Sequence, residues 1–316
     1  MNISNSTDDK HNTEETMKTY VHLLAFIFTF VFSYCIMRTI RKEAALRNQV
    51  RYILLCHHLI CVVAFFGVGI LFHGLRMFRV AVPRIVCWII FDIQVTLGRG
   101  IILTLTLMAL NTCLSVCAPL RYLSIIHSLK GKVIIITWIL ATLNPVWSTI
   151  QASCTVQLTY LTERDPTCPT ALHGTDSRIA AIVFLSLLSL LIIFSYCLIY
   201  REGKRAGHFS RSNIRGRKTI LIHSLQMSLH IIPTFIILAT VRKPFEVKLL
   251  SFLVFSVAQA LSPIVFGLRS KELKSKLPEI KLSCRWICGL KNCNKIMDTE
   301  GNQPSVSVLN DSESYE

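Results

Sequence analysis

Apolar residues along this chain fall in long continuous runs, and they do not alternate with polar positions. Each run is about 20 residues long, which is the length a helix needs to cross the hydrocarbon core of a bilayer. The runs cover residues 20–40, 52–72, 87–110 (with helix expected as far as 117), 133–150, 179–200, 219–241 and 249–267. This pattern predicts an all-α bundle of seven transmembrane helices.

The connections between the runs are short, so we expect one compact bundle without a second domain. The predicted organisation is an amino-terminal segment over residues 1–19, a seven-helix domain over residues 20–267 and a tail over residues 268–316. The first run lacks a basic leader and is followed at once by Arg38, Arg41 and Lys42. We therefore expect it to remain as a span and not to be removed as a signal peptide.

Composition agrees with a membrane protein. Hydrophobic residues make up 52% of the 316 positions, charged residues make up 16%, and the mean hydropathy is +0.51. A soluble core of this length does not need so much apolar surface. The net charge of +16 would also suit a nucleic-acid partner. The cations lie in loops beside the predicted spans, however, so we expect membrane lipids as their partners and no nucleic acid.

The basic residues indicate which way the bundle faces. They are concentrated in the first, third and fifth connections and at the start of the tail. The positive-inside rule places these segments in the cytosol and the amino terminus outside, and seven crossings bring the carboxy terminus inside. Asn2 and Asn5 begin sequons on the outer terminus and are candidate glycosylation sites. The second connection runs against the rule, and its cations either snorkel at helix ends or attract an anionic ligand: Arg76, Arg79 and Arg84.

Twelve cysteines divide by their predicted location. Cys87 begins the third span on the outer side, and Cys168 lies in the middle of the longest outer loop. An oxidising exterior permits a bridge between them, and this is the preferred pairing. Cys154, at the beginning of the same loop, is the alternative partner.

The segment after the seventh run is basic over residues 271–281, which suits a short amphipathic helix on the inner leaflet. Beyond it the tail becomes polar and acidic, which is typical of disorder. Three cysteines close to the basic segment are candidate palmitoylation sites: Cys284, Cys288 and Cys293.

Ionisable side chains inside the predicted spans are functional candidates, because charge is costly in hydrocarbon. Asp92 and Arg99 both lie on the third span. Seven residues are nearly two helical turns, so they share a face but lie about 10 Å apart along the axis, too far for a simple ion pair. Arg99 could bind a ligand, or it could have a structural role and pair with carbonyls or hydroxyls of a neighbouring helix.

Intramembrane histidines raise the hypothesis of a seven-span zinc hydrolase. His58 lies in the second span, and His223 and His230 lie on one stripe of the sixth. No carboxylate lies at the same depth to act as a metal ligand or general base. We therefore expect these histidines to form hydrogen bonds within the bundle, and we predict no enzymatic site, metal or cofactor.

Several positions resemble landmarks of the rhodopsin class of G protein-coupled receptors. They are Trp138, Ser195-Tyr196, Pro233, the run from Leu261 to Phe266, and Cys117-Ala118-Pro119-Leu120-Arg121-Tyr122 after the third span. Residues 111–124 and 217–224 are most similar to an orphan receptor of this class. Fish-type odorant receptors, the second choice, are similar around the last span. The resemblance covers all seven predicted spans.

This resemblance implies a receptor of the plasma membrane with no enzymatic activity of its own. It implies an extracellular or small-molecule ligand, and a cytosolic G protein, arrestin or both as partners. In this class the third helix lines the ligand cavity. Asp92 and Arg99, on this helix, are therefore candidate ligand-binding residues. His230 in the sixth span and Gln259 in the seventh are the other candidates.

The positions that switch such receptors depart from the class. Spacing from Cys87 places Asn111-Thr112-Cys113 where the class carries Asp/Glu-Arg-Tyr, so the cation that contacts the G protein is missing. Phe266 replaces a tyrosine three residues after Pro263, whereas Tyr196 and Pro233 keep their types. We expect weak or atypical G protein activation, or alternatively that Arg121 takes over docking.

Overall fold

The computed structural model describes residues 2–170, 175–205, 224, 227, 228, 230–238, 245–269 and 273, with the backbone alone for 2–11, 120, 121, 123–130, 175, 245, 268 and 269. The elements within these residues are α1 (Asn2–Lys42), α2 (Ala44–Arg47), α3 (Val50–Met77), β1 (Val82–Pro83), α4 (Arg84–Cys117), α5 (Pro119–Thr155), α6 (Leu158–Thr162), β2 (Arg164–Asp165), α7 (Thr175–Arg205) and α9 (Phe245–Arg269).

Six of the described helices are long and apolar enough to cross a membrane: α1, α3, α4, α5, α7 and α9. They confirm the predicted helical bundle. The predicted sixth span, residues 219–241, lies partly outside the described residues, although 230–238 are helical. The amphipathic helix and the three cysteines expected after the seventh span also lie outside the described part of the chain.

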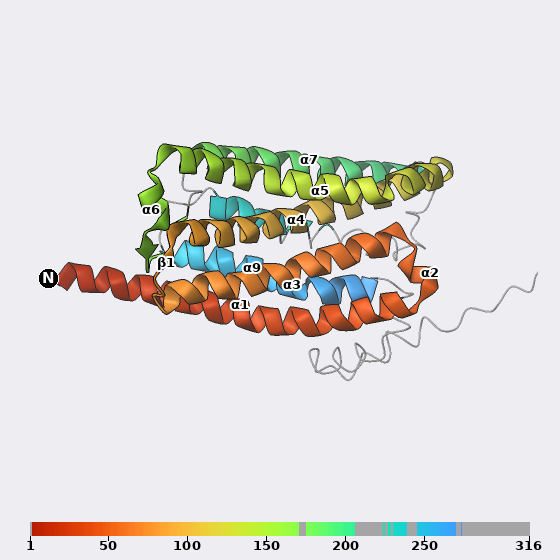
Figure 1. Ribbon diagram of the computed structural model, residues 1–316. Coiled ribbons are helices and arrows are strands. Elements are labelled where there is room, and N and C mark those ends of the chain that lie inside the picture. Colours follow the sequence, from red (N-terminus) through yellow and green to blue (C-terminus); the bar gives the residue numbers. More distant parts are fainter. Residues whose placement is uncertain are drawn as a thin grey trace, which may run out of the picture.

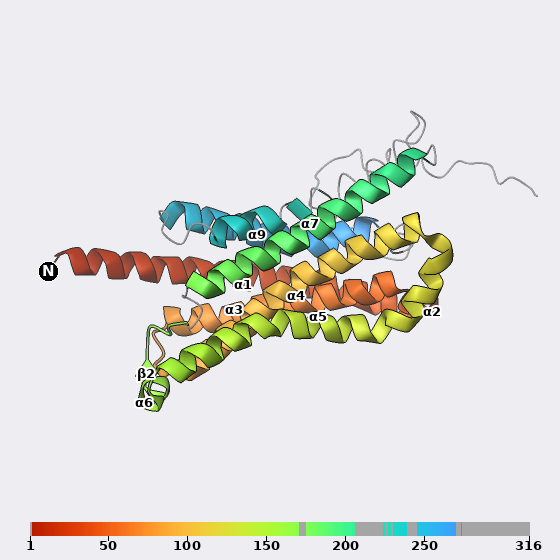
Figure 2. The same cartoon turned by 90° about the horizontal axis from the view of Figure 1, so that it is seen from above.

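The long helices run side by side along one direction (Figure 1). One end carries β1, β2 and α6 together with a disulfide, and we call it the disulfide end. The other end carries α2, and we call it the basic end because α1 finishes there with Arg41 and Lys42. Helix α4 packs against α3, α5 and α7, while α1 packs against α3 and α9 (Figure 2).

Several helices continue beyond the apolar runs that predicted them. Helix α5 begins at Pro119 although its run begins at residue 133, and proline is favourable there because the first helical N–H has no partner in any case. Helix α1 begins at Asn2, so the predicted boundary between residues 19 and 20 is not a break in the backbone. Hydropathy marks the part of a helix that hydrocarbon can cover, whereas the backbone hydrogen bonds extend further.

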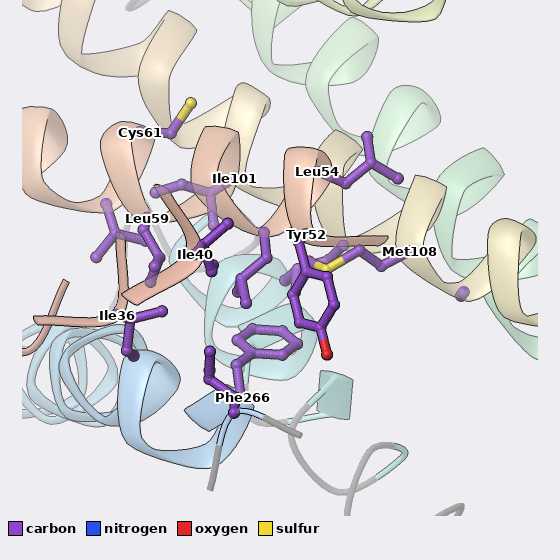
Figure 3. Close-up of a cluster of buried hydrophobic side chains, with 14 of the residues drawn as sticks. Ile36, Ile40, Tyr52, Leu54, Leu59, Cys61, Ile101, Met108 and Phe266 are labelled. Carbon is purple, nitrogen blue, oxygen red and sulfur yellow. The ribbon is translucent and has the colours of Figure 1, made fainter. Parts of the chain in front are cut away.

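The largest buried cluster joins α1, α3, α4 and α9 (Figure 3). Its members include Ile36, Ile40, Tyr52, Leu59, Ile101, Met108 and Phe266. A second cluster joins α4 to α5 and α7 through Ile102, Leu103, Ala141, Leu185 and Leu188. The α1–α3 contact is close at Gly69, where an added Cβ would lie 2.5 Å from the His22 ring. The core therefore holds the bundle together along its whole width.

The outward faces of the helices are apolar rather than polar. Large side chains on α1, α5 and α7 are 61–68% exposed: Leu24, Leu143, Trp147, Leu190 and Phe194. Soluble monomers rarely expose so many large apolar side chains together. This apolar surface fits hydrocarbon, and the chain is a multi-pass membrane protein.

Candidate functional site

The disulfide end is closed by a short sheet and a covalent bridge. Strand β1 pairs antiparallel with β2, placing Val82 opposite Asp165. Cys87 and Cys168 form the disulfide, and Phe72 packs against both. Of the two predicted pairings the structure contains this one, and Cys154 is an exposed free thiol. The loop between α5 and α7 is thereby fixed to the first turn of α4.

Arg84 adds polar contacts between the start of α4 and the loop that joins α5 to α7. Its Nε donates to Asp165 Oδ2 at 2.9 Å, it pairs with the Glu163 carboxylate, and its guanidinium lies 4.0 Å from the centre of the Tyr160 ring. The Thr167 side chain also donates to Asp165, and this hydrogen bond, with the Arg84 contact, holds the pKa of Asp165 below its ordinary value. The sequence had indicated that Arg84 either snorkels or attracts an anionic ligand. In the structure its guanidinium is instead occupied by Asp165, Glu163 and Tyr160.

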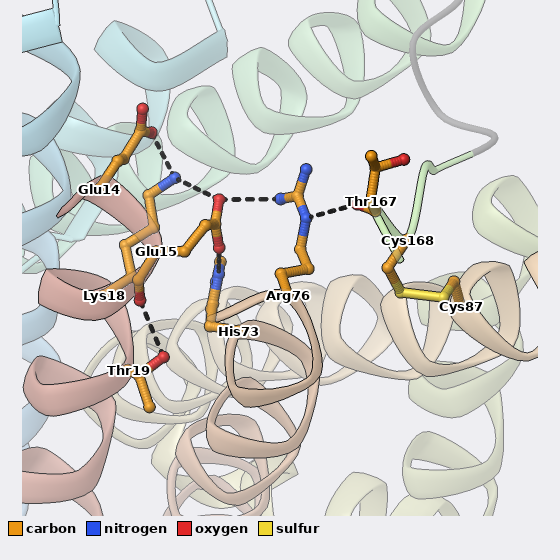
Figure 4. A network of polar contacts seen from close by, with 9 residues as sticks. All are labelled: Glu14, Glu15, Lys18, Thr19, His73, Arg76, Cys87, Thr167 and Cys168. Atoms are coloured by element: carbon orange, nitrogen blue, oxygen red, sulfur yellow. Dashed lines mark hydrogen bonds and ion pairs between the residues drawn. A yellow bond between two sulfur atoms is a disulfide. The ribbon is translucent and has the colours of Figure 1, made fainter. Parts of the chain in front are cut away.

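A second polar cluster joins α1 to α3 at this end, and Figure 4 shows it next to the disulfide. Glu15 is 2% exposed, and its two carboxylate oxygens contact His73 Nδ1 at 2.6 Å and an Arg76 guanidinium nitrogen at 3.0 Å. Lys18 lies 3.7 Å from Glu15 and also pairs with Glu14. A buried carboxylate needs such partners, because desolvation of an isolated charge is costly.

Arg76 extends this cluster to the loop. Its Nε donates to the Thr167 carbonyl at 3.1 Å, one residue before Cys168. Beneath the cluster, His22 is fully buried and its ring stacks on His73 at 5.2 Å. Arg76, on α3, therefore links α1 and the loop through its hydrogen bonds. The snorkelling interpretation is wrong for Arg76 as well.

Asp92 and Arg99 do not form one site. The guanidinium of Arg99 lies 4.4 Å from the centre of the Phe184 ring on α7, while Asp92 faces Thr149 on α5. The two residues lie nearly two turns apart on α4, but α4 packs against both α5 and α7 and the side chains diverge. Within the described part of the chain, the contact of the Arg99 guanidinium is therefore with an aromatic ring.

His230 and Gln259, the other predicted ligand-binding residues, are both fully buried. Their side-chain nitrogen and oxygen atoms have no hydrogen-bond partner within the described part of the chain. Buried polar groups without partners are uncommon in folded proteins. No hydrogen bond among the described residues joins any two of the four candidates, so the structure does not assemble them into one constellation.

His58 is one of the intramembrane histidines for which the sequence predicted hydrogen bonds within the bundle, and the structure contains them. It lies on α3 with no exposed surface, and its ring contacts both neighbouring helices. Nδ1 lies 3.2 Å from Thr104 Oγ1 on α4, and Nε2 lies 3.3 Å from Ser262 Oγ on α9. The Phe266 ring meets it edge-on at 5.2 Å, and the His230 ring stacks at 6.5 Å.

The hydrogen bonds of Thr104 decide which nitrogen of His58 carries the proton. Thr104 donates its hydroxyl hydrogen to the Ile101 carbonyl at 2.8 Å, so its oxygen can only accept from His58. Nδ1 of His58 is therefore the donor, and Nε2 of the neutral ring accepts from the Ser262 hydroxyl. One neutral imidazole thus links three helices, and the serine it contacts precedes Pro263 of α9.

We expect His58→Leu to weaken the packing of α3 against α4 and α9. The substitution leaves Ser262 without its acceptor and removes two hydrogen bonds, at a cost of about 1–3 kcal/mol for the unpaired buried group. The measurement is the thermal midpoint of the purified protein in detergent. His57→Leu is the control, because His57 is only half-buried. Equal midpoints for both variants would contradict the linking role of His58.

The triplet near the basic end of α4 makes contacts within α4 and with α5. Thr112 donates its hydroxyl to the Met108 carbonyl at 2.8 Å, and the Cys113 sulfur lies 3.8 Å from that of Cys117. Asn111 accepts a hydrogen bond of 3.2 Å from the Tyr122 hydroxyl on α5. None of the three side chains carries a charge.

The remaining switch positions lie around the core. Phe266 belongs to the largest cluster and Tyr196 packs against it. Pro263 lies inside α9, and Pro233 is buried in the helical segment 230–238. Arg121 is in α5, but its side chain is outside the described part of the structure, as are those of the two candidate glycosylation sites, Asn2 and Asn5. Among the described residues, no group of three His, Cys, Asp or Glu side chains is placed to hold a metal ion.

The chain is similar in sequence to receptors of the G protein-coupled type, and the bundle of membrane-capable helices fits that class. One relative is "Probable G-protein coupled receptor 148" from Homo sapiens, 27% identical over 216 residues, which cover 64% of this chain and 61% of the receptor. Another is "Odorant receptor 131-2" from Danio rerio, 26% identical over 317 residues, which cover 91% of this chain and 92% of the receptor.

No family model matches the chain. The match to the human receptor spans less than two thirds of that receptor's length. Both relatives are receptors rather than enzymes, which fits the prediction of a receptor. These similarities support a relationship of the chain to receptors of the G protein-coupled type.

Proposed function

We propose that this chain is an orphan rhodopsin-like receptor of the plasma membrane with weak or atypical coupling to G proteins. A ligand at the disulfide end would favour one arrangement of the helices, and cytosolic partners such as a G protein or arrestin would respond to it. The proposal rests on the two receptor relatives and on the uncharged triplet of α4.

The orientation proposed for this receptor has the disulfide end outside the cell and the basic end in the cytosol. The cations at the end of α1 and α7 support it, because positive residues are retained on the cytosolic side. Residues 1–19 would then be extracellular, 20–267 would form the seven-helix domain and 268–316 would be the cytosolic tail. Glycosylation at the amino terminus and palmitoylation of the tail cysteines belong to the same proposal.

Thr112 is the observation that carries the proposed weakness of coupling. Its position is where the class has an arginine, and its hydroxyl is already occupied by the Met108 carbonyl of its own helix. A threonine is too short to reach a partner bound at the basic end, and it offers no charge to a G protein. Arg121 is the alternative docking cation.

Arg99 is the proposed contact for an anionic or carbonyl-bearing ligand. Its guanidinium lies over the Phe184 ring, and no carboxylate forms an ion pair with it within the described chain. A cation at membrane depth without an anionic partner is a functional candidate. Asp92, His230 and Gln259 remain secondary candidates, because each is buried and lies on an element that lines the bundle interior.

Guanine-nucleotide exchange tests the coupling proposal. We expect the unaltered chain in nanodiscs to leave the basal exchange rate of a purified heterotrimeric G protein close to that with empty nanodiscs. The triple variant Asn111→Asp, Thr112→Arg, Cys113→Tyr is expected to raise the rate several-fold, because it restores the cation and its acidic neighbour. Thr112→Ala, which adds no charge, is the control.

Two outcomes contradict this proposal. Rapid exchange with the unaltered chain would show that coupling does not need the triplet cation. Silence of the restored variant, in protein that is folded and inserted, would show that the bundle does not drive a G protein at all. Arrestin recruitment, scored in cells with the same variants, then decides whether the tail supports another output.

A second candidate is an odorant receptor for small molecules. The observation that favours it is the length of the match to the zebrafish odorant receptor, which covers nearly the whole of both chains. Transcripts confined to olfactory sensory neurons would support this candidate. Transcripts distributed across other tissues would favour the orphan receptor.

A further inference from the structure

A groove lies on the surface of α1 at the basic end. It has a volume of about 280 Å³, and its lining is Tyr34, Met37, Arg38, Arg41 and Lys42. These residues repeat at intervals of three and four, so they form one face of the helix. Ile36 and Ile40 are buried on the other face, against the core. The groove therefore opens away from the bundle.

The groove is strongly cationic. Arg38, Arg41 and Lys42 are all exposed, and no carboxylate is among the lining residues. None of the three forms an ion pair within the described part of the chain. Guanidinium groups bind phosphate through two parallel hydrogen bonds, and a lysine adds a point charge. The chemistry of this surface matches a group that carries several phosphates.

An apolar stripe continues from the groove toward the middle of α1. Ile27, Phe30, Val31 and Tyr34 are 51–54% exposed, and they lead directly to the cationic residues. A soluble anion would contact the cations alone, whereas a lipid could place its headgroup on the cations and its acyl chains along this stripe. The juxtaposition of phosphate-binding cations and an exposed apolar stripe selects an amphiphile.

We propose that this groove binds the headgroup of a phosphorylated inositol lipid, with the acyl chains along the apolar stripe of α1. The proposal rests on the orientation given above, which puts the basic end in the cytosolic leaflet where such lipids are found. Polybasic segments beside a membrane span are attracted to these lipids. Here the attraction is focused on one groove rather than spread over all the basic loops.

The test uses the full-length chain purified in nanodiscs of neutral phosphatidylcholine, titrated with short-chain phosphatidylinositol 4,5-bisphosphate. The triple variant Arg38→Gln, Arg41→Gln, Lys42→Gln is expected to bind about a hundredfold more weakly, since each of the three cations contributes roughly a fivefold factor. The matched control removes the same charge from the basic end of α7: Arg201→Gln, Lys204→Gln, Arg205→Gln. We expect its affinity to remain close to that of the unaltered chain.

Equal losses in the two triple variants would overturn the proposal, because binding would then follow total charge. Free inositol 1,4,5-trisphosphate is the second ligand, and binding as tight as that of the lipid would overturn the role of the apolar stripe. The binding assay needs no G protein, so it is independent of coupling. An amino-terminal tag that proved inaccessible on intact cells would overturn the orientation, whereas failed lipid binding with an accessible tag would overturn this inference alone.

Discussion

Replacing Cys168 by serine is expected to lower the stability of the bundle more than any other single change at the disulfide end. The bridge joins positions 81 residues apart, and closing a segment of that length is worth about 4 kcal/mol in the unfolded chain. Cys87 and Cys168 are also fully buried against Phe72, so the variant disturbs packing as well. The measurement is the fraction of tagged receptor at the surface of intact cells, together with the thermal midpoint in detergent.

Cys154→Ser is the matched control for this prediction. Cys154 lies in the same part of the chain but is an exposed free thiol. Its replacement should leave both the surface fraction and the midpoint unchanged. A large loss from the Cys154 variant, with little effect of the Cys168 variant, would show that Cys154 forms the bridge in cells.

Glu15→Gln is expected to release the first helix from α3. The amide keeps the size of the side chain but removes the charge that balances Arg76 and the short contact with His73. Breaking a buried ion pair on one side leaves the other group uncompensated, and we expect a loss of about 2–3 kcal/mol for this partly exposed cluster. The thermal midpoint of the purified protein measures it.

Glu14→Gln separates this effect from a general change of charge. Glu14 precedes Glu15 directly, but its partner is Lys18, the side chain four residues later on the same helix. Pairs of this kind contribute about 0.3–0.5 kcal/mol. The Glu14 variant should therefore melt close to the unaltered chain, and equal losses from the two variants would contradict the linking role of Glu15.

The helical bundle was predictable because the hydropathy of each span is a local property. The ends of the helices were not. Pro119 and Asn2 begin helices in stretches that are too polar to register as spans, and their place depends on backbone hydrogen bonds and caps rather than on apolar periodicity. The disulfide was one of two predicted pairings, because chain position alone left both Cys168 and Cys154 within reach of Cys87.

The polar contacts were harder to predict, since the partners are remote in sequence. Arg76 meets a carboxylate 61 residues earlier, and Arg84 meets one 81 residues later. His58 bonds to groups 46 and 204 residues away. The helical spacing of Asp92 and Arg99 gave their common face, but only the packing of α4 between two neighbours showed that their side chains part.

The unbroken first helix has a consequence for how this protein can be observed. Helix α1 continues past the disulfide end to Asn2, and the buried carboxylate of Glu15 anchors the projecting part to α3. A short fluorophore attached close to Thr13 would therefore rotate with the entire protein, and it would not move independently on a flexible amino-terminal segment. Its polarisation would then report the tilt of the bundle relative to the membrane normal.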